Sequence, residues 1–87
     1  MNAVITVVGK DMVGILAKVS QVCYQANVNI ADVTQTVLKD YFAMIMLVEM
    51  DRMNTDFEKF RENLERAVPE MKVHVMHQDI FDSMHRI

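Results

Sequence analysis

The turn over residues 9–14 combines the residue types that could bind a small charged ligand. It reads Gly-Lys-Asp-Met-Val-Gly and leads into a helical stretch. The start of a helix offers unpaired backbone N–H groups to a carboxylate, and Gly14, which lacks a side chain, lets a ligand come close to them. Asp11 could accept hydrogen bonds from an ammonium group. Capping of the helix is the commoner use of such a residue, and the residues alone favour it.

A second polar cluster lies where this helix passes into the next strand. Asn27 and Asn29 flank Val28 there, and each side-chain amide offers a donor and an acceptor to a polar ligand. Asn is also a frequent helix stop because it tolerates the left-handed conformation, and it is a frequent turn former. On their own, the two asparagines are better explained as a helix stop and a turn residue.

The other candidates for chemistry are weak. His74 and His77 lie three residues apart in a predicted strand, so they point to opposite faces and do not share a metal. Cys23 is the only cysteine, which excludes an internal disulfide and a CxxC site, and it lies in an apolar helical stripe with no nearby cation to activate it. We therefore expect no metal, no cofactor and no catalytic residue.

Hydrophobic patterns predict four strands. They cover residues 3–8, 28–38, 41–50 and 71–76, which are rich in Val, Ile and Met. The apolar phase shifts near Ala31–Asp32, which predicts a bulge. The turn Lys39-Asp40 would join the second and third strands as an antiparallel hairpin, although it lacks the Asn-Gly or Asp-Gly sequence typical of such turns.

Apolar residues at three- and four-residue spacing predict helices over residues 15–26 and 57–68. Thr55, with Glu58 three residues later, has the form of a capping box at the start of the second helix, and Pro69 ends that helix. The predicted order is β-α-β-β-α-β, an α+β ferredoxin-like sandwich with a four-stranded antiparallel sheet and both helices on one face. We expect one domain over residues 1–79 and a short amphipathic C-terminal extension over 80–87.

The face of the sheet away from the helices is predicted to be apolar. In the third strand Phe42, Met44 and Met46 alternate with Ala43, Ile45 and Leu47, so both sides of the strand are apolar. Monomers rarely leave such a patch in water. We therefore expect the C-terminal extension or a second copy to cover it, and we predict a homodimer or a higher homo-oligomer.

The turn and the asparagine cluster together resemble the signature of the ACT domain family. The segment over residues 7–16, Val-Val-Gly-Lys-Asp-Met-Val-Gly-Ile-Leu, is followed by Asn-Val-Asn-Ile at 27–30. In that family a strand ends in a D-x-P-G-type turn, a helix follows, and an Asn-Ile pair opens the next strand. The resemblance covers about the first 79 residues. More narrowly, the chain is similar to small stand-alone ACT proteins of bacteria and archaea and to ACT modules of the glycine-cleavage-repressor type.

This resemblance implies a non-catalytic regulatory module that binds a small ligand, an amino acid, at a homodimer interface. The positions that carry over from the family are Asp11, Val13, Gly14, Asn29 and Ile30. Val13 stands where many family members have proline, which makes the turn less rigid.

Charge and hydropathy exclude other classes of function. The net charge is −3, and no basic stripe is present that could replace counterions around phosphates, so we expect no nucleic-acid binding. The sequence shows no signal peptide and no apolar run of membrane-spanning length, so we expect a cytoplasmic protein that does not bind membranes.

Two alternatives use the same predicted order of elements. An acylphosphatase-like enzyme needs an arginine in the first turn to hold a phosphate, and here no arginine occurs before Arg52. An enzyme is therefore not expected. The remaining alternative is an interaction subunit that binds a larger protein partner through its apolar sheet face or its extension and has no small-molecule ligand.

Overall fold

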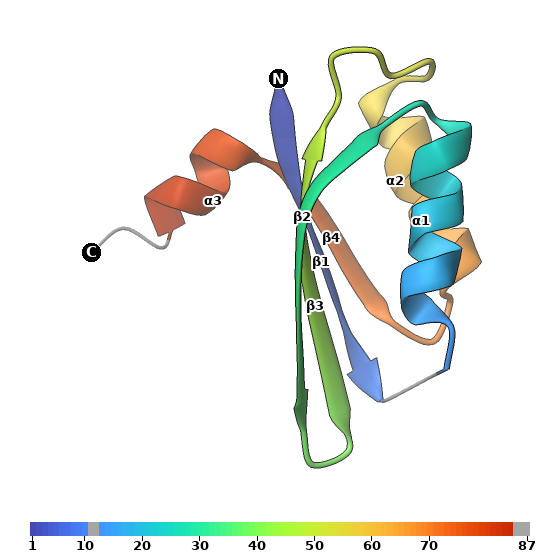
Figure 1. The fold of residues 1–87 in the computed structure, drawn as a ribbon, viewed down its shortest axis with the longest axis vertical. Helices are drawn as coiled ribbons and strands as arrows, with labels where there is room; N and C mark the ends of the chain where they lie inside the picture. The colour runs from blue at the N-terminus through green and yellow to red at the C-terminus, as the bar shows by residue number, and fades with distance from the viewer. Residues whose placement is uncertain (11–12, 85–87) are drawn as a thin grey trace.

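The structure is a computed structural model that describes residues 1–10 and 13–84 of the chain. The elements are β1 (Asn2–Lys10), α1 (Ile15–Gln25), β2 (Asn29–Leu38), β3 (Tyr41–Glu49), α2 (Phe57–Ala67), β4 (Lys72–His77) and α3 (Gln78–Met84). The four strands form one antiparallel sheet in the order β2-β3-β1-β4. Helices α1 and α2 lie on one face of the sheet, and α3 lies on the other (Figure 1). The predicted ferredoxin-like fold is confirmed.

Strand register fixes which side chains share a face. Val7 pairs with Met44 and Val73, and Ile5 pairs with Met46 and Val75. These side chains point toward α1 and α2, and the intervening residues point to the opposite side. We call that opposite side the open face. Its central residues come from β1 and β3: Val4, Thr6, Val8, Tyr41, Ala43, Ile45 and Leu47.

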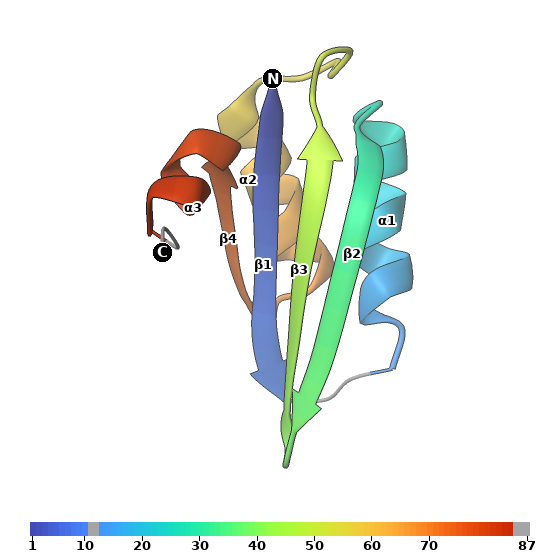
Figure 2. The ribbon, with the colours of Figure 1, turned by 60° about the vertical axis from the view of Figure 1, so that its left-hand side comes forward.

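The two ends of the sheet are distinguished in Figure 2. β1 starts at the top of that view, beside the end of β3 and the start of β2, and we call this end, with Asn2, Asn29 and Glu49, the upper end. The lower end contains Lys10 and Lys72, and the β2–β3 hairpin extends beyond it.

The core lies between the sheet and the two long helices. Its largest side chains are fully buried, and the helical stripes and the inward side of β1 and β3 contribute about equally to them. They are Ile5, Ile15, Met44, Met46, Phe60 and Leu64. Met44 and Met46 belong to this core, where their flexible side chains adapt to the gaps between the helices and the sheet.

The β2–β3 hairpin has the predicted features. The register shifts between Ile30 and Asp32, which is the expected bulge, and the Asp32 carboxylate accepts a hydrogen bond from the Val33 backbone N–H at 2.9 Å. Leu38 pairs with Tyr41, so the loop has only Lys39 and Asp40. Lys39 adopts a φ of 56°. Lys39 therefore adopts the left-handed conformation, which in such turns is usually adopted by glycine or asparagine.

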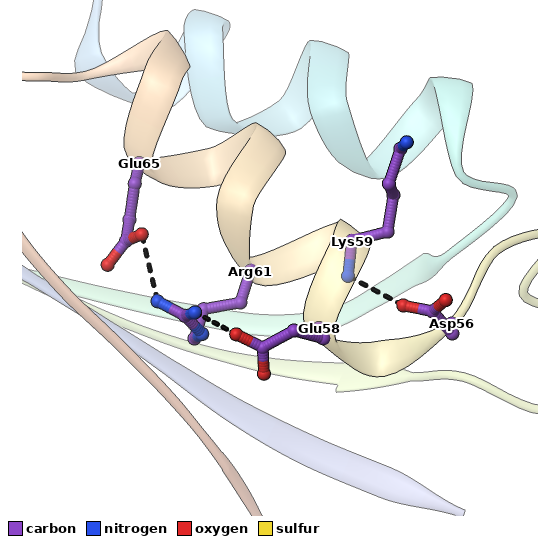
Figure 3. Close-up of polar contacts among 5 residues, drawn as sticks. All are labelled: Asp56, Glu58, Lys59, Arg61 and Glu65. Carbon is purple, nitrogen blue, oxygen red and sulfur yellow. Dashed lines mark hydrogen bonds and ion pairs between the residues drawn. The ribbon is translucent and has the colours of Figure 1, made fainter.

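Helix α2 starts one residue later than a capping box at Thr55 requires. Asp56 is the N-cap, and its carboxylate accepts a hydrogen bond from the Lys59 backbone N–H at 2.7 Å. Asp caps a helix at least as well as Thr. With Asp56 as the cap, the third residue after it is Lys59, so Glu58 does not complete the predicted capping box. Glu58 instead pairs with Arg61, which also contacts Glu65 at 2.8 Å (Figure 3). These ion pairs lie on the outer side of the helix.

Cys23 is 1% exposed, and burial raises the pKa of its thiol to about 11. The folded protein favours the neutral thiol, so the raised pKa of Cys23 contributes to the free energy of unfolding. This contribution is fully present below the ordinary pKa of cysteine and is lost as pH rises through the pKa of the folded state. We expect Cys23 to react with a thiol reagent at pH 8 only as fast as the chain unfolds, and denaturant should accelerate labelling strongly. Rapid labelling of the folded protein would contradict this burial.

Candidate functional site

Helix α1 ends in a motif that places Asn29. Asn27 follows the helix with a φ of 59°, and the backbone N–H groups of Asn27 and Val28 donate to the carbonyls of Tyr24 and Cys23 at 3.1 and 2.8 Å. This is the Schellman arrangement, which satisfies the last carbonyls of a helix. The prediction that Asn27 stops the helix is confirmed. The chain then turns into β2, and Asn29 becomes its first residue.

The loop after β3 is fastened to the same helix end by two asparagines. The Asn27 side-chain amide donates to the Arg52 carbonyl at 2.9 Å. The Asn54 side-chain amide donates to the Gln25 carbonyl at 3.0 Å, and its backbone N–H donates to the Ala26 carbonyl at 3.0 Å. These bonds hold the loop beside the start of β2.

Between these two segments is a pocket of about 320 Å³, which we call the Asn29 pocket. It is lined by Tyr24, Asn27, Val28, Asn29, Glu49, Asp51 and Arg52. The Asn29 amide donates to Glu49 Oε1 at 2.7 Å, and Asp51 pairs with the N-terminal ammonium of Met1. Within the described residues the Arg52 guanidinium makes no hydrogen bond or ion pair. The pocket therefore offers carboxylates and a free cation, a combination that suits a zwitterion.

The other predicted site residues lie at the start of α1. Gly14 is the N-cap, with a φ of 86° that favours glycine, and a Cβ added there would meet nothing within 4 Å. Val13 is 96% exposed. The backbone at this helix start is therefore open to an approaching group. Asp11 lies outside the described residues.

The structure does not bring the two predicted clusters together within one chain. Gly14 precedes α1 and Asn29 follows it, and 11 helical residues separate the two ends, a length of about 16 Å at the usual helical rise. Figure 2 shows the chain entering α1 near the lower end of the sheet and leaving it near the upper end, where β2 begins. Ile30 is half-buried and packs against the core, so only its backbone faces a ligand at Asn29.

A stripe of three side chains, of which Leu16 and Tyr24 are exposed and Ser20 is half-buried, connects the two clusters along α1. Leu16, Ser20 and Tyr24 recur every four residues and so share one side of the helix. Leu16 is 38% exposed and Tyr24 is 80% exposed. The opposite flank of α1 faces α2 across a groove lined by Lys18, Gln21 and Gln25. The stripe, which we call the α1 flank, therefore lies toward β2, the edge strand of the sheet.

Glu49, Asp51 and Arg52 were not among the predicted site residues. The position of Glu49 could have been predicted from the hairpin. With a two-residue turn at 39–40 and a one-residue bulge, the register places Glu49 opposite Asn29. No pattern in the sequence indicated Arg52, whose position depends on the hydrogen bonds that fold its loop against α1.

The histidines lie as the alternation of the strand requires. His74 pairs with Thr6 and is exposed on the open face, whereas His77 lies on the helix face and stacks on Phe57 with 5.1 Å between the ring centroids. Among residues 1–10 and 13–84, no three His, Cys, Asp or Glu side chains are grouped as metal ligands. No helix in those ranges is long and apolar enough to cross a bilayer.

Comparisons with known proteins agree with this architecture. The sequence model of the ACT domain matches residues 2–78. A UPF0237 protein of Methanopyrus kandleri is 45% identical over 88 positions, which cover 99% of this chain and 98% of that protein. An ACT domain protein from Streptococcus pneumoniae superposes with a TM-score of 0.78 at 39% identity, and 94% of each chain is covered. The regulatory subunit of aspartate kinase from Thermus thermophilus superposes with a TM-score of 0.64 at 24% identity, over 85% of this chain and 49% of that one, which shows a shared fold.

Proposed function

Because this chain belongs to the ACT domain family, we propose that it is a regulatory module that binds an amino acid where two copies of the chain meet. The observation that carries the proposal is the position of Gly14 and Asn29 at the two ends of one exposed helix flank. One chain cannot bring both ends to the same ligand, because the length of α1 separates them.

A two-fold axis through the middle of the α1 flank joins these halves. It sets two α1 helices side by side in opposite directions, so Gly14 of one copy lies beside the Asn29 pocket of the other. Ser20, near the middle of the flank, is small enough for the helices to approach closely. Exposed Leu16 and Tyr24 become buried in this arrangement, and such apolar and aromatic side chains are typical of interface centres. The edge strands β2 also come together antiparallel.

The chemistry of the joined site suits a free amino acid. The backbone N–H groups at the start of one α1, with the Arg52 guanidinium of the other copy, would hold the carboxylate. Glu49 and Asp51 would hold the ammonium group, and the Asn29 amide would orient it. All these groups bind without activating a bond, which fits a non-catalytic module. A ligand held by both copies stabilises the dimer over the separate chains, and this coupling is the basis of regulation.

The alternative of an interaction subunit without a small ligand is favoured by one observation. Val8, Ile45 and Tyr41 remain 41%, 41% and 58% exposed on the open face. That surface could bind a larger protein whether or not the Asn29 pocket is filled, so the ligand needs a direct test.

The test is a thermal-unfolding screen of the individual amino acids. We expect at least one to raise the melting temperature, since a ligand at 100 times its Kd adds about 2.7 kcal/mol, more than about 10 °C for a domain of this size. Asn29→Ala and Asp11→Ala should each abolish the shift. Asn63→Ala is the matched control, because Asn63 lies on α2, away from the α1 flank.

The interaction-subunit alternative predicts a different result from the same screen. No amino acid would then change the melting temperature of the wild-type chain. An equal shift in the wild type and in Asn29→Ala would place the ligand elsewhere on the molecule.

A further inference from the structure

The open face is covered at one corner only. Helix α3 packs against β1 and β4 at the upper end, where it buries Val4 to 3% exposure outside the main core. The rest of the face stays in contact with water, including Val8 and Ile45 at 41% exposure. Helix α3 also stands out from the sheet (Figure 1), and its own Ile80 and Met84 are 51% and 65% exposed.

The two ends of this face carry opposite charge. Helix α3 at the upper end carries Asp79 and Asp82. At the lower end, Lys10 pairs with Tyr41, and Lys72 pairs with Val8, so both lysines lie beside exposed apolar side chains of the open face. The upper ends of β2 and β3, by contrast, carry Asp32 and Glu49 on this face.

We propose that a second copy of this chain covers the open face, with the two sheets face to face and α3 of each copy lying over the lower end of β1 and β4 of the other. A two-fold interface needs a surface that is complementary to itself. This face has that property. The corner formed by α3 is acidic, apolar and protruding, and the lower end is basic, apolar and uncovered, so the two match in shape and charge.

Charge selects one of the two ways in which the sheets can meet. A two-fold axis across the strands sets α3 over Lys10 and Lys72. An axis along the strands would set α3 over the upper ends of β2 and β3, where Asp32 and Glu49 repel its two aspartates. Opposed like charges disfavour that packing strongly. The geometry therefore favours the axis across the strands.

This interface is separate from the one in the proposed function. It uses the lower end of the open face and α3, whereas the other interface uses the α1 flank, and the Asn29 pocket with Glu49 lies at the upper end. With both interfaces the chain would form a tetramer with two kinds of dimer contact. Each interface can then fail in an experiment without the other.

Disulfide cross-linking between two single-cysteine variants tests the proposal. Met84→Cys and Lys72→Cys are prepared separately, mixed and oxidised, so any bond between the two new cysteines joins two chains. The buried Cys23 gives little background. We expect a cross-linked heterodimer from this pair. Lys59→Cys is the matched control, since Lys59 is exposed on α2 on the opposite side of the sheet, and it should cross-link poorly to Met84→Cys.

Charge reversal gives a second measurement that does not depend on cysteine chemistry. Lys72→Glu should weaken this contact about tenfold, because the change occurs twice in a symmetric interface, and adding Asp82→Lys to the same chain should restore most of it. A chain that sediments as a monomer once the α1 flank is blocked by Leu16→Arg would overturn the proposal. So would equal cross-linking of Met84→Cys to Lys72→Cys and Lys59→Cys.

Discussion

Phe60→Ala is expected to lower the free energy of unfolding by about 3–5 kcal/mol. Phe60 is 0% exposed in α2 and lies at the centre of the cluster between both long helices and the sheet. A domain of this size has a total stability of roughly 4–13 kcal/mol. Loss of one ring can therefore leave a large fraction of the chain unfolded at 37 °C. Urea unfolding at matched protein concentration measures the change.

Phe57→Ala is the matched control for this prediction. Phe57 is the same residue type one turn earlier in α2, but it is only half-buried at the margin of the core, where its ring stacks on that of His77. Its replacement should cost about 1–2 kcal/mol, in line with partial burial and one ring contact. Equal losses for the two variants would mean that the core is not centred where the structure places it.

Leu16→Arg is expected to halve the mass of the particle in solution and to remove the response to the amino acid. Leu16 lies on the α1 flank four residues before Ser20, so across the two-fold axis it faces Tyr24 of the other copy, and the substitution places two charges in the interface and removes two apolar contacts. Central interface residues of this kind contribute enough that we expect dimerisation through the flank to weaken by at least about 100-fold. Sedimentation gives the mass, and the thermal-unfolding screen gives the response.

Gln21→Arg adds the same charge to the other flank of α1, which faces α2. It should leave both the mass and the ligand response unchanged. Asn29→Ala should remove the response and keep the mass, because it alters the pocket and not the contact between helices. If Leu16→Arg kept a full ligand response, the site would be complete within one chain, and the two-copy arrangement would be wrong.

The strands and their pairing follow from the sequence because their causes are local. Alternation in β3 and the short turn at Lys39 and Asp40 fix the hairpin, and the phase shift near Ala31 locates the bulge. The N-cap of α2 was misplaced by one residue because Thr55 and Asp56 are both good capping residues. Only the direction of the chain entering the helix decides between Thr55 and Asp56.

The site was predicted less completely, and for a different reason. Gly14 and Asn29 were identified as separate clusters, and the helix between them already implied that they lie apart. Arg52 entered the pocket through a loop held by amide hydrogen bonds to backbone carbonyls. Such bonds depend on tertiary geometry and leave no periodic trace in the sequence.

The central position of β1 also constrains how the protein is made. β1 is the first strand to leave the ribosome, yet it pairs with β3 on one side and with β4 on the other. His77, the last residue of β4, pairs with Ala3, so the sheet cannot close until residue 77 has emerged. Until then β1, which has apolar residues on both faces, remains unpaired on the side of β4. Such long-range pairing slows folding and leaves nascent chains open to aggregation. We therefore expect this chain to refold more slowly than a fold of the same size built from neighbouring segments.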